Sequence, residues 1–149
     1  MATWHEVRQA VPELAALVEE SFAVRKHATL ATLRQDGSPR ISGTEVELTE
    51  AEVAIGSMPG ARKAADLRRD PRFALHSPTV DPPEEDPSAW AGEAKLAGLA
   101  VETGPLEGPP QGDRFVLDVR EVVLTRVEGD QLVIRSWHEG RGEQVVRRS

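Results

Sequence analysis

Three short strand-like runs separated by tight-turn signals occupy residues 27–58, and they restrict the chain to a fold built on antiparallel strands. The runs read HATLATLR at 27–34, RISGTEVEL at 40–48 and VAIGSM at 53–58. Asp36-Gly37 stands between the first two, and Asp-Gly between strand-like runs is a strong hairpin signal. The pattern therefore predicts a three-stranded antiparallel meander.

The remainder of the chain adds helices at two places and more strands. One apolar stripe with helical spacing predicts an N-terminal helical segment over 1–24, which Pro12 divides near its middle. Pro59-Gly60 and Asp70-Pro71 bracket a short internal helix over 61–69, because the residue before proline disfavours helical backbone. Further strands are expected at 73–78, 94–102, 115–127 and 132–137, followed by a polar, basic tail. Six or seven antiparallel strands predict a mainly β (α+β) barrel rather than a parallel sheet.

Length and loop composition indicate one domain covering 1–149. A chain of 149 residues matches the usual size of a single domain. Residues 79–93 contain three prolines and five acidic residues but no basic one, so we expect a long exposed acidic loop. A second Gly/Pro-rich connection is expected at 104–113.

The charge and residue content exclude several classes of function. The 18 basic and 25 acidic residues give a net charge of −7, which argues against general affinity for nucleic acid or an anionic membrane. Cysteine is absent, which excludes disulfides and thiolate chemistry. No apolar stretch approaches the ~20 residues that span a bilayer, and the N-terminus lacks the pattern of a secretory signal. A soluble cytoplasmic protein is the expectation.

Familiar catalytic and metal-binding motifs are absent from the sequence. The histidines are too far apart in sequence for a local metal motif, and they are His5, His27, His76 and His138. There is no G-x-S-x-G elbow, phosphate-binding P-loop or G-x-G-x-x-G fingerprint. We therefore predict no side chain as a catalytic acid, base or nucleophile, and no metal site.

The most informative stretch is the junction at 56–63, where a strand ends, a Pro-Gly turn follows and a helix opens with Arg62 and Lys63. A helix N-terminus presents unpaired amides and the positive end of the macrodipole, so cations are unfavourable there. Residues 62–72 carry a net charge of +3, from five cations and two acids, in a chain of −7. An anionic ligand such as a phosphate would explain this reversal. The alternative is a solvated helix face with ion pairs to the acidic loop.

Two further features are open to a functional and a structural interpretation. Gly43 lies inside a strand, which often marks close approach by a ligand or another chain, and Ser42 and Thr44 beside it can donate hydrogen bonds. Plain packing at a bend of the barrel is the alternative. Trp137 ends the last predicted strand and either covers a flat ring or belongs to the core.

Taken together, the segments at 27–48, 53–75 and 136–142 resemble the pyridoxamine 5'-phosphate oxidase-like split β-barrels, the flavin/deazaflavin oxidoreductase group. The resemblance implies a six-stranded antiparallel split β-barrel with an N-terminal helix and a short internal helix. It also implies a homodimer with FMN bound at the interface between the two copies.

The resemblance assigns cofactor-binding roles to ten residues. Arg62 and Lys63 match the pair that grips the FMN phosphate, with Ala61 where the family's serine would stand. Trp137 and Arg141 match an aromatic residue and an arginine that reach the cofactor from the partner chain. The others match strand segments beside the ring and phosphate: Arg40, Ile41, Ser42, Gly43, Ser57 and Met58.

The expected function is that of an FMN-binding oxidoreductase, with hydride transfer between the flavin and an unknown small substrate. In such enzymes the cofactor carries the chemistry and the protein supplies binding and orientation, which agrees with the lack of catalytic motifs. A deazaflavin-dependent reductase, a non-catalytic flavin- or heme-binding module, and an interaction domain without a cofactor are the alternatives.

Overall fold

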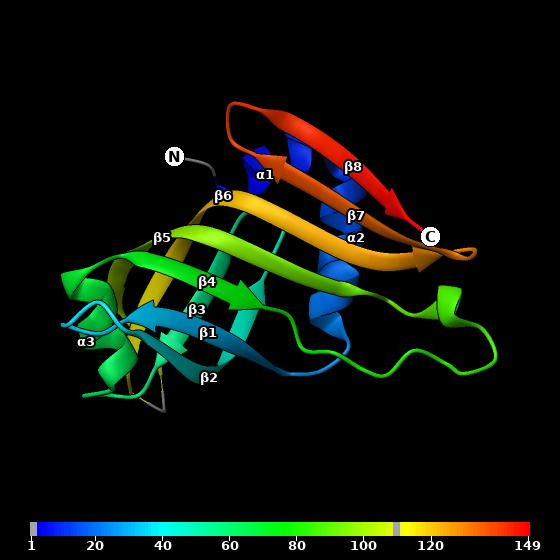
Figure 1. Cartoon of the computed structure of the whole chain (residues 1–149). Helices are drawn as coiled ribbons and strands as arrows, with labels where there is room; N and C mark the ends of the chain where they lie inside the picture. The colour runs from blue at the N-terminus through cyan, green and yellow to red at the C-terminus, as the bar shows by residue number, and fades with distance from the viewer. Residues whose placement is uncertain (1–2, 109–110) are drawn as a thin grey trace.

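A computed structural model of the chain describes residues 3–108 and 111–149, and its centre is a closed six-stranded antiparallel barrel (Figure 1). The sheet order is β3-β2-β1-β4-β5-β6-β7-β8, and an additional β3–β6 pairing closes the first six strands into the barrel. This confirms the predicted barrel. The strands are β1 (His27–Leu33), β2 (Pro39–Leu48), β3 (Val53–Ser57), β4 (Arg72–His76), β5 (Glu93–Pro105), β6 (Asp113–Glu128), β7 (Gln131–His138) and β8 (Gly142–Arg148).

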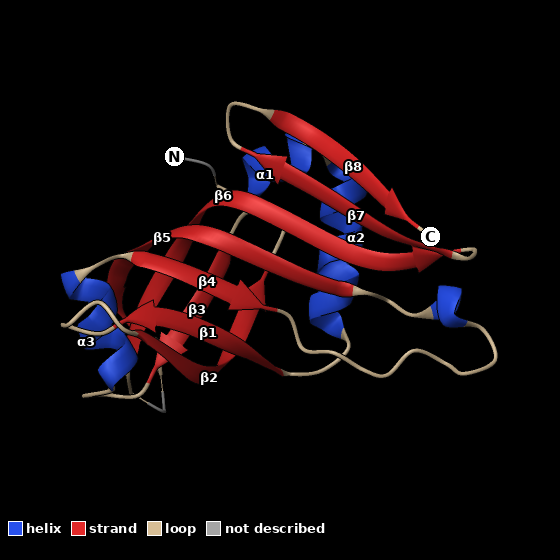
Figure 2. Cartoon of the chain, viewed as in Figure 1, coloured by secondary structure: helices blue, strands red, loops and turns tan. Residues whose placement is uncertain are grey.

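The helices lie where the sequence predicts them (Figure 2). Helix α1 (Trp4–Ala10) and helix α2 (Pro12–Ala23) divide at Pro12, which occupies the first turn of α2. The predicted apolar stripe is buried along its whole length, and it consists of Trp4, Val7, Val11, Leu14 and Val18. The internal helix is α3 (Arg62–Arg69). None of the helices in the described part of the chain is long and apolar enough to cross a membrane.

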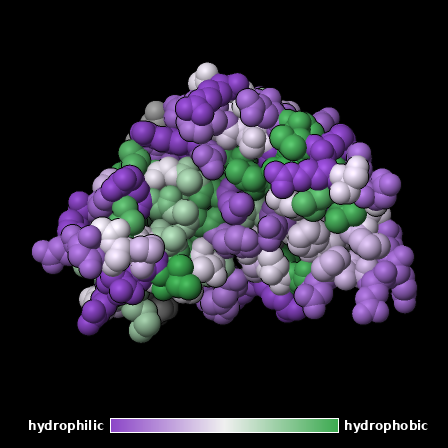
Figure 3. Space-filling model, viewed as in Figure 1, coloured by the Kyte–Doolittle hydropathy of each residue, from purple (hydrophilic) through white to green (hydrophobic). Residues whose placement is uncertain are grey.

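The core fills the barrel and continues under the N-terminal helices. Leu30, Leu75, Leu96, Phe115 and Leu117 are each at most 1% exposed, so the barrel interior is packed with side chains. Helix α2 contacts β2, β5 and β6 and thereby covers one side of the barrel. The face shown in Figure 3 is mostly hydrophilic, with apolar side chains in separate groups. Helix α3 lies at the lower left of Figure 1, and the β7–β8 hairpin runs along the upper side of the molecule.

The C-terminal tail forms a strand that the sequence did not predict. Strand β8 pairs with β7 from His138↔Gly142 to Leu132↔Arg148, and it forms the free edge of the sheet. All of its residues are exposed, so it lacks the alternation of buried and exposed positions that marks a strand in sequence. Residues 3–108 and 111–149 therefore contain eight strands, six in the barrel and two in this extension.

The two long connections are largely as expected. Strand β4 ends at His76, two residues before the predicted boundary, and the acidic loop that follows contains the short 3₁₀ helix η1 (Pro87–Ala89). Trp90 donates from Nε1 to the carbonyl of Val80 at 2.7 Å and so ties the loop to itself. Strands β5 and β6 extend into the predicted 104–113 connection, of which residues 109–110 lie outside the described residues.

Candidate functional site

Strands β2 and β3 separate beside helix α3, although the barrel as a whole is closed. This separation, named here the split, positions the candidate site. Strand β2 pairs with β1 from Pro39 to Glu45, but it pairs with β3 only through Val46–Leu48. The beginning of β2 and the end of β3 therefore diverge, and α3 begins just beyond β3. Two hollows occupy this region, and Met58 and Lys63 line both of them.

The first hollow, named here the cation hollow, has a volume of about 430 Å³ and is strongly basic. Half of its eight lining residues are cations and none is acidic. A concave site with this charge is suited to a phosphate or another compact anion. Its lining residues are Arg34, Arg40, Ile41, Ser42, Met58, Ala61, Arg62 and Lys63.

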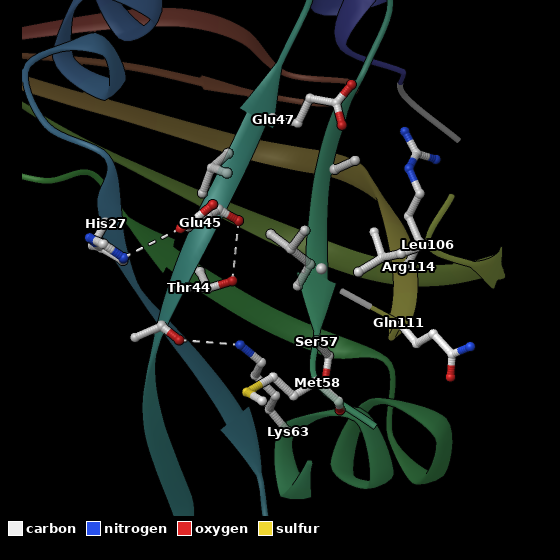
Figure 4. Close-up of a pocket in the computed structure, with 15 residues that line it drawn as sticks. His27, Thr44, Glu45, Glu47, Ser57, Met58, Lys63, Leu106, Gln111 and Arg114 are labelled. Carbon is white, nitrogen blue, oxygen red and sulfur yellow. Dashed lines mark hydrogen bonds and ion pairs between the residues drawn. The ribbon is translucent and has the colours of Figure 1, made fainter. Parts of the chain in front are cut away.

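Lys63 bridges the split from the helix to the strand. Its Nζ donates to the carbonyl oxygen of Gly43 at 3.2 Å (Figure 4). The ammonium is half-buried, and burial lowers the pKa of Lys63. Within the described part of the chain no carboxylate pairs with it, so the cost of burying this charge is not offset by an opposite charge.

The first turn of α3 carries a second cation and uncapped amides. Arg62 is exposed and forms no ion pair with any described residue. The N-cap position is Ala61, which has no side chain able to accept a hydrogen bond from the first-turn amides. The charge of Arg62 opposes the helix macrodipole, and these amides can donate to an anion.

Arg40 is held by a buried carboxylate beneath the cation hollow. Its Nε donates to Oδ2 of Asp66 at 2.7 Å, and Asp66 is 3% exposed. Thr32 Oγ1 donates to the same oxygen at 2.8 Å, and Arg69 Nη2 donates to Oδ1 at 3.0 Å. Burial alone would raise the pKa of Asp66, but these hydrogen bonds outweigh it and hold the pKa below its usual range.

The other cations of 62–72 have partners of their own. Arg68 binds Glu102 at 3.0 Å and Asp113 at 3.1 Å, and Arg72 pairs with Asp70. No ion pair among the described residues links this segment to residues 79–93, so what remains of the alternative is a solvated helix face without those pairs. The local excess of positive charge is thus concentrated at the start of α3.

The second hollow, named here the ring hollow, lies between the diverging strands and has a volume of about 500 Å³ (Figure 4). One wall consists of residues 43–47 of β2, and the other includes residues 54–57 of β3. Arg114, which binds Glu52 at 2.7 Å, and Gln111 add polar groups at one side. Its lining combines apolar side chains with a small number of polar and charged groups, as ligand pockets commonly do.

Gly43 borders this hollow without being required by the fold. Its φ angle is not positive, and a Cβ atom placed on it would meet no atom within 4 Å. Packing at a barrel bend therefore does not explain the glycine in this chain. Ile41 and Met58 lie close by and are each 74% exposed, although both are large and apolar.

Comparisons with known proteins give likenesses in structure alone. No protein-family model matches the sequence, and no curated protein sequence matches it. PhzG from Burkholderia lata 383, solved with tetrahydrophenazine-1-carboxylic acid, has 13% identity and a TM-score of 0.63 over 96% of this chain and 89% of its own. A pyridoxamine 5'-phosphate oxidase-related, FMN-binding protein from Nostoc punctiforme PCC 73102 has 10% identity and a TM-score of 0.61 over 93% and 96%. An F420 reductase has 18% identity and a TM-score of 0.51 over 69% and 94%.

The chain has the pyridoxamine 5'-phosphate oxidase-like split-barrel fold. The resemblance seen in the sequence is thereby confirmed for the architecture. Identities of 10–18% do not carry a ligand or an activity from these proteins to this one.

Within this split barrel, eight of the ten predicted site residues line the two hollows. They are Arg40, Ile41, Ser42, Gly43, Ser57, Met58, Arg62 and Lys63. The other two, Trp137 and Arg141, line a separate depression on the β7–β8 hairpin. Trp137 is 8% exposed and belongs to the core cluster, so its own chain covers nearly all of its ring.

Sequence reasoning missed three residues that shape the site. Arg34 lines the cation hollow from the β1–β2 turn, Arg114 lines the ring hollow, and Asp66 holds Arg40. A buried acid on a helix face gives little local signal, because two of its three partners, Thr32 and Arg40, come from β1 and β2. The structure shows no group of three or more histidine, aspartate or glutamate side chains suited to a metal ion within 3–108 and 111–149.

Proposed function

We propose that this chain binds FMN at the barrel split and acts as an FMN-dependent oxidoreductase on a small substrate. The observation that carries the proposal is the cation hollow: Arg62 and Lys63 open α3 against the macrodipole, without a carboxylate partner among the described residues. Because charges in these positions destabilise the fold, we expect them to bind a ligand. A phosphate dianion is the ligand that their type and spacing fit best.

The residues present fit both ends of FMN. Arginine can hydrogen-bond two phosphate oxygens, lysine adds a point charge, and the uncapped amides of α3 add further donors. The ring hollow adjoins the cation hollow through Met58 and Lys63, so one molecule can place its phosphate in one and its ring in the other. The flavin would supply hydride chemistry when bound. The chain would bind it, orient it and exclude water from its ring.

A deazaflavin with a polyanionic tail is the second candidate. Arg34 adds a fourth cation to the hollow, which favours a ligand with more negative charge than a single phosphate. The structural likeness to an F420 reductase supports the same alternative. The two candidates differ in the anionic tail rather than in the site that would hold it.

We further propose that a second copy of the chain completes the site. The family resemblance implies a homodimer in which Trp137 and Arg141 reach the partner's cofactor, and in one protomer these residues lie away from the hollows. Because Trp137 is only 8% exposed, Arg141 would make most of this contact and Trp137 would add only the edge of its ring. Ile41 and Met58, which border the cation hollow, are apolar surface that a second copy would cover. Light scattering at micromolar concentration should give the mass of a dimer. A monomer under these conditions would contradict a shared site.

The function is tested by the visible spectrum of freshly purified protein and by mass spectrometry of what heating releases. The proposal predicts flavin absorbance and released FMN, or uptake of added FMN by protein purified without it. Release of a deazaflavin would favour the second candidate. Oxidation of a reduced nicotinamide with bound FMN would distinguish an oxidoreductase from a storage or sensing module. Failure to take up FMN or a deazaflavin, or uptake of hemin instead, would refute the proposal.

A further inference from the structure

The nitrogen atoms of the Arg40 guanidinium differ in their surroundings. Its Nε donates to the buried carboxylate of Asp66 at 2.7 Å, while the residue lines the cation hollow. Neither of its Nη atoms has a hydrogen-bond partner among residues 3–108 and 111–149. A planar guanidinium fixed at Nε has a defined orientation, so its remaining donors point in a fixed direction.

The carboxylate that fixes Arg40 is itself fixed from three directions. Oδ2 of Asp66 accepts from Arg40 and from Thr32 on β1, and Oδ1 accepts from Arg69 one turn further along α3. Arg69 Nη2 also donates to the carbonyl of Leu33 at 2.6 Å. Asp66 therefore joins α3 to β1 and β2 at the floor of the split.

We propose that Asp66 is a positioning residue for the cofactor phosphate: it holds Nε of Arg40 so that the Nη edge faces the cation hollow and donates to the phosphate. The inference rests on the proposed function, because it concerns the phosphate end of that site. Asp66 itself does not touch the ligand. It acts through Arg40.

A positioning role for Asp66 and a purely electrostatic role predict opposite changes in FMN affinity when Asp66 is neutralised. Asp66 is a negative charge beneath a hollow for anions, so its charge alone repels a phosphate. If only charge mattered, Asp66→Asn would raise FMN affinity. If positioning matters, Asp66→Asn lowers FMN affinity, because a neutral amide holds Arg40 less firmly and its donors lose alignment.

The experiment measures the Kd of FMN and of riboflavin, which has the same ring without a phosphate, for wild type and variants. Asp66→Asn should reduce the preference for FMN over riboflavin about ten- to hundredfold, the value of one charge-assisted hydrogen bond. Thr32→Val is the matched control, since it removes another bond to the same carboxylate oxygen but leaves Arg40 paired. It should lower stability while keeping the FMN preference.

Arg40→Lys keeps the inference testable if Asp66→Asn does not fold. A single ammonium cannot bind Asp66 and the phosphate in the two directions that a guanidinium spans. Arg40→Lys should therefore lose as much FMN preference as Arg40→Gln. Once Arg40→Gln is present, adding Asp66→Asn should change the preference no further.

The outcomes separate this inference from the proposed function. An unchanged or increased FMN preference in Asp66→Asn, or full preference in Arg40→Lys, overturns the positioning role even if Arg62→Ala with Lys63→Ala abolishes the preference. A wild-type protein that binds FMN no better than riboflavin overturns the phosphate site itself, and with it the role of Asp66.

Discussion

The two ends of helix α3 carry similar charges with opposite consequences. At its C-terminal end, Arg68 and Arg69 have carboxylate partners and lie where the macrodipole favours cations. At its N-terminal end, Arg62 and Lys63 have no carboxylate partner among the described residues and lie where the macrodipole disfavours them. Charges at the C-terminal end are thus accounted for by the fold, and charges at the N-terminal end are not.

The directions of the pKa shifts of Asp66 and Lys63 follow the same contrast. The hydrogen bonds to Asp66 lower the pKa of a carboxyl group, so folding favours its charged form. Burial lowers the pKa of an ammonium group at Lys63, so folding disfavours its charged form. A charge that weakens its own fold is a candidate for a ligand contact. This is why we place the phosphate at the beginning of α3.

The largest effect on stability is expected from the loss of Asp66, which pairs with Arg69 at the C-terminal end of α3. Asp66→Ala removes a buried carboxylate and leaves Arg40 and Arg69 without their charge partner. Breaking a buried pair in this way typically costs about 3–5 kcal/mol. Denaturant unfolding of the ligand-free protein measures the loss. If Asp66→Ala lowers the free energy of unfolding no more than Arg62→Ala does, the cations at the two ends of the helix do not differ in their contribution to the fold.

The carboxylate of Asp66 should also make the stability of the protein depend on pH. Because the folded-state pKa of Asp66 lies below its unfolded value, its contribution to stability is fully present above the unfolded value of about 3.9 and is lost as pH falls through the folded value. Unfolding at intervals from about pH 6 to about pH 3 should show wild type losing more stability than Asp66→Asn. Parallel curves for the two proteins would mean that Asp66 is not held as a stabilised anion.

The smallest effect on stability is expected at Gly43, opposite Lys63 across the split. A Cβ atom there meets nothing within 4 Å, so Gly43→Val should change the free energy of unfolding by at most about 0.5 kcal/mol. The added side chain would occupy space beside the ring hollow, so affinity for both FMN and riboflavin should fall. Melting curves and ligand titrations on the same preparation test this. Unchanged affinity for both ligands would remove Gly43 from the site.

Local sequence signals were sufficient to predict the barrel and to select eight residues that line the two hollows. Hairpin turns and period-two runs predict β1 to β3, and cations after Pro59-Gly60 mark the beginning of α3. These signals work because the residues concerned are close in sequence and have a local physical cause. Eight predicted site residues consequently line the hollows at the split.

The remaining features depend on contacts that sequence patterns do not contain. Strand β8 is exposed on both faces, and β7 is the one strand that pairs with it in the described part of the chain. Its residues therefore show no alternation of buried and exposed positions. Asp66 gains its role from Thr32 and Arg40, which lie 34 and 26 residues away along the chain. Trp137 could be core or ligand contact by type alone, and the structure places it in the core cluster of one protomer.

The proposed contact of Arg62 and Lys63 with the cofactor phosphate is tested by paired titrations with FMN and riboflavin. Arg62→Ala with Lys63→Ala should weaken FMN binding by about 3–6 kcal/mol, two to four decades in Kd, from the loss of two charge-assisted contacts. Riboflavin binding and the melting temperature of the ligand-free protein should not fall. The control is Arg147→Ala with Arg148→Ala, which removes the same charge from exposed positions on β8 and should leave FMN affinity intact. Unchanged FMN affinity in the first variant, or an equal loss for riboflavin, would contradict the phosphate site and leave the pair as a solvated helix end.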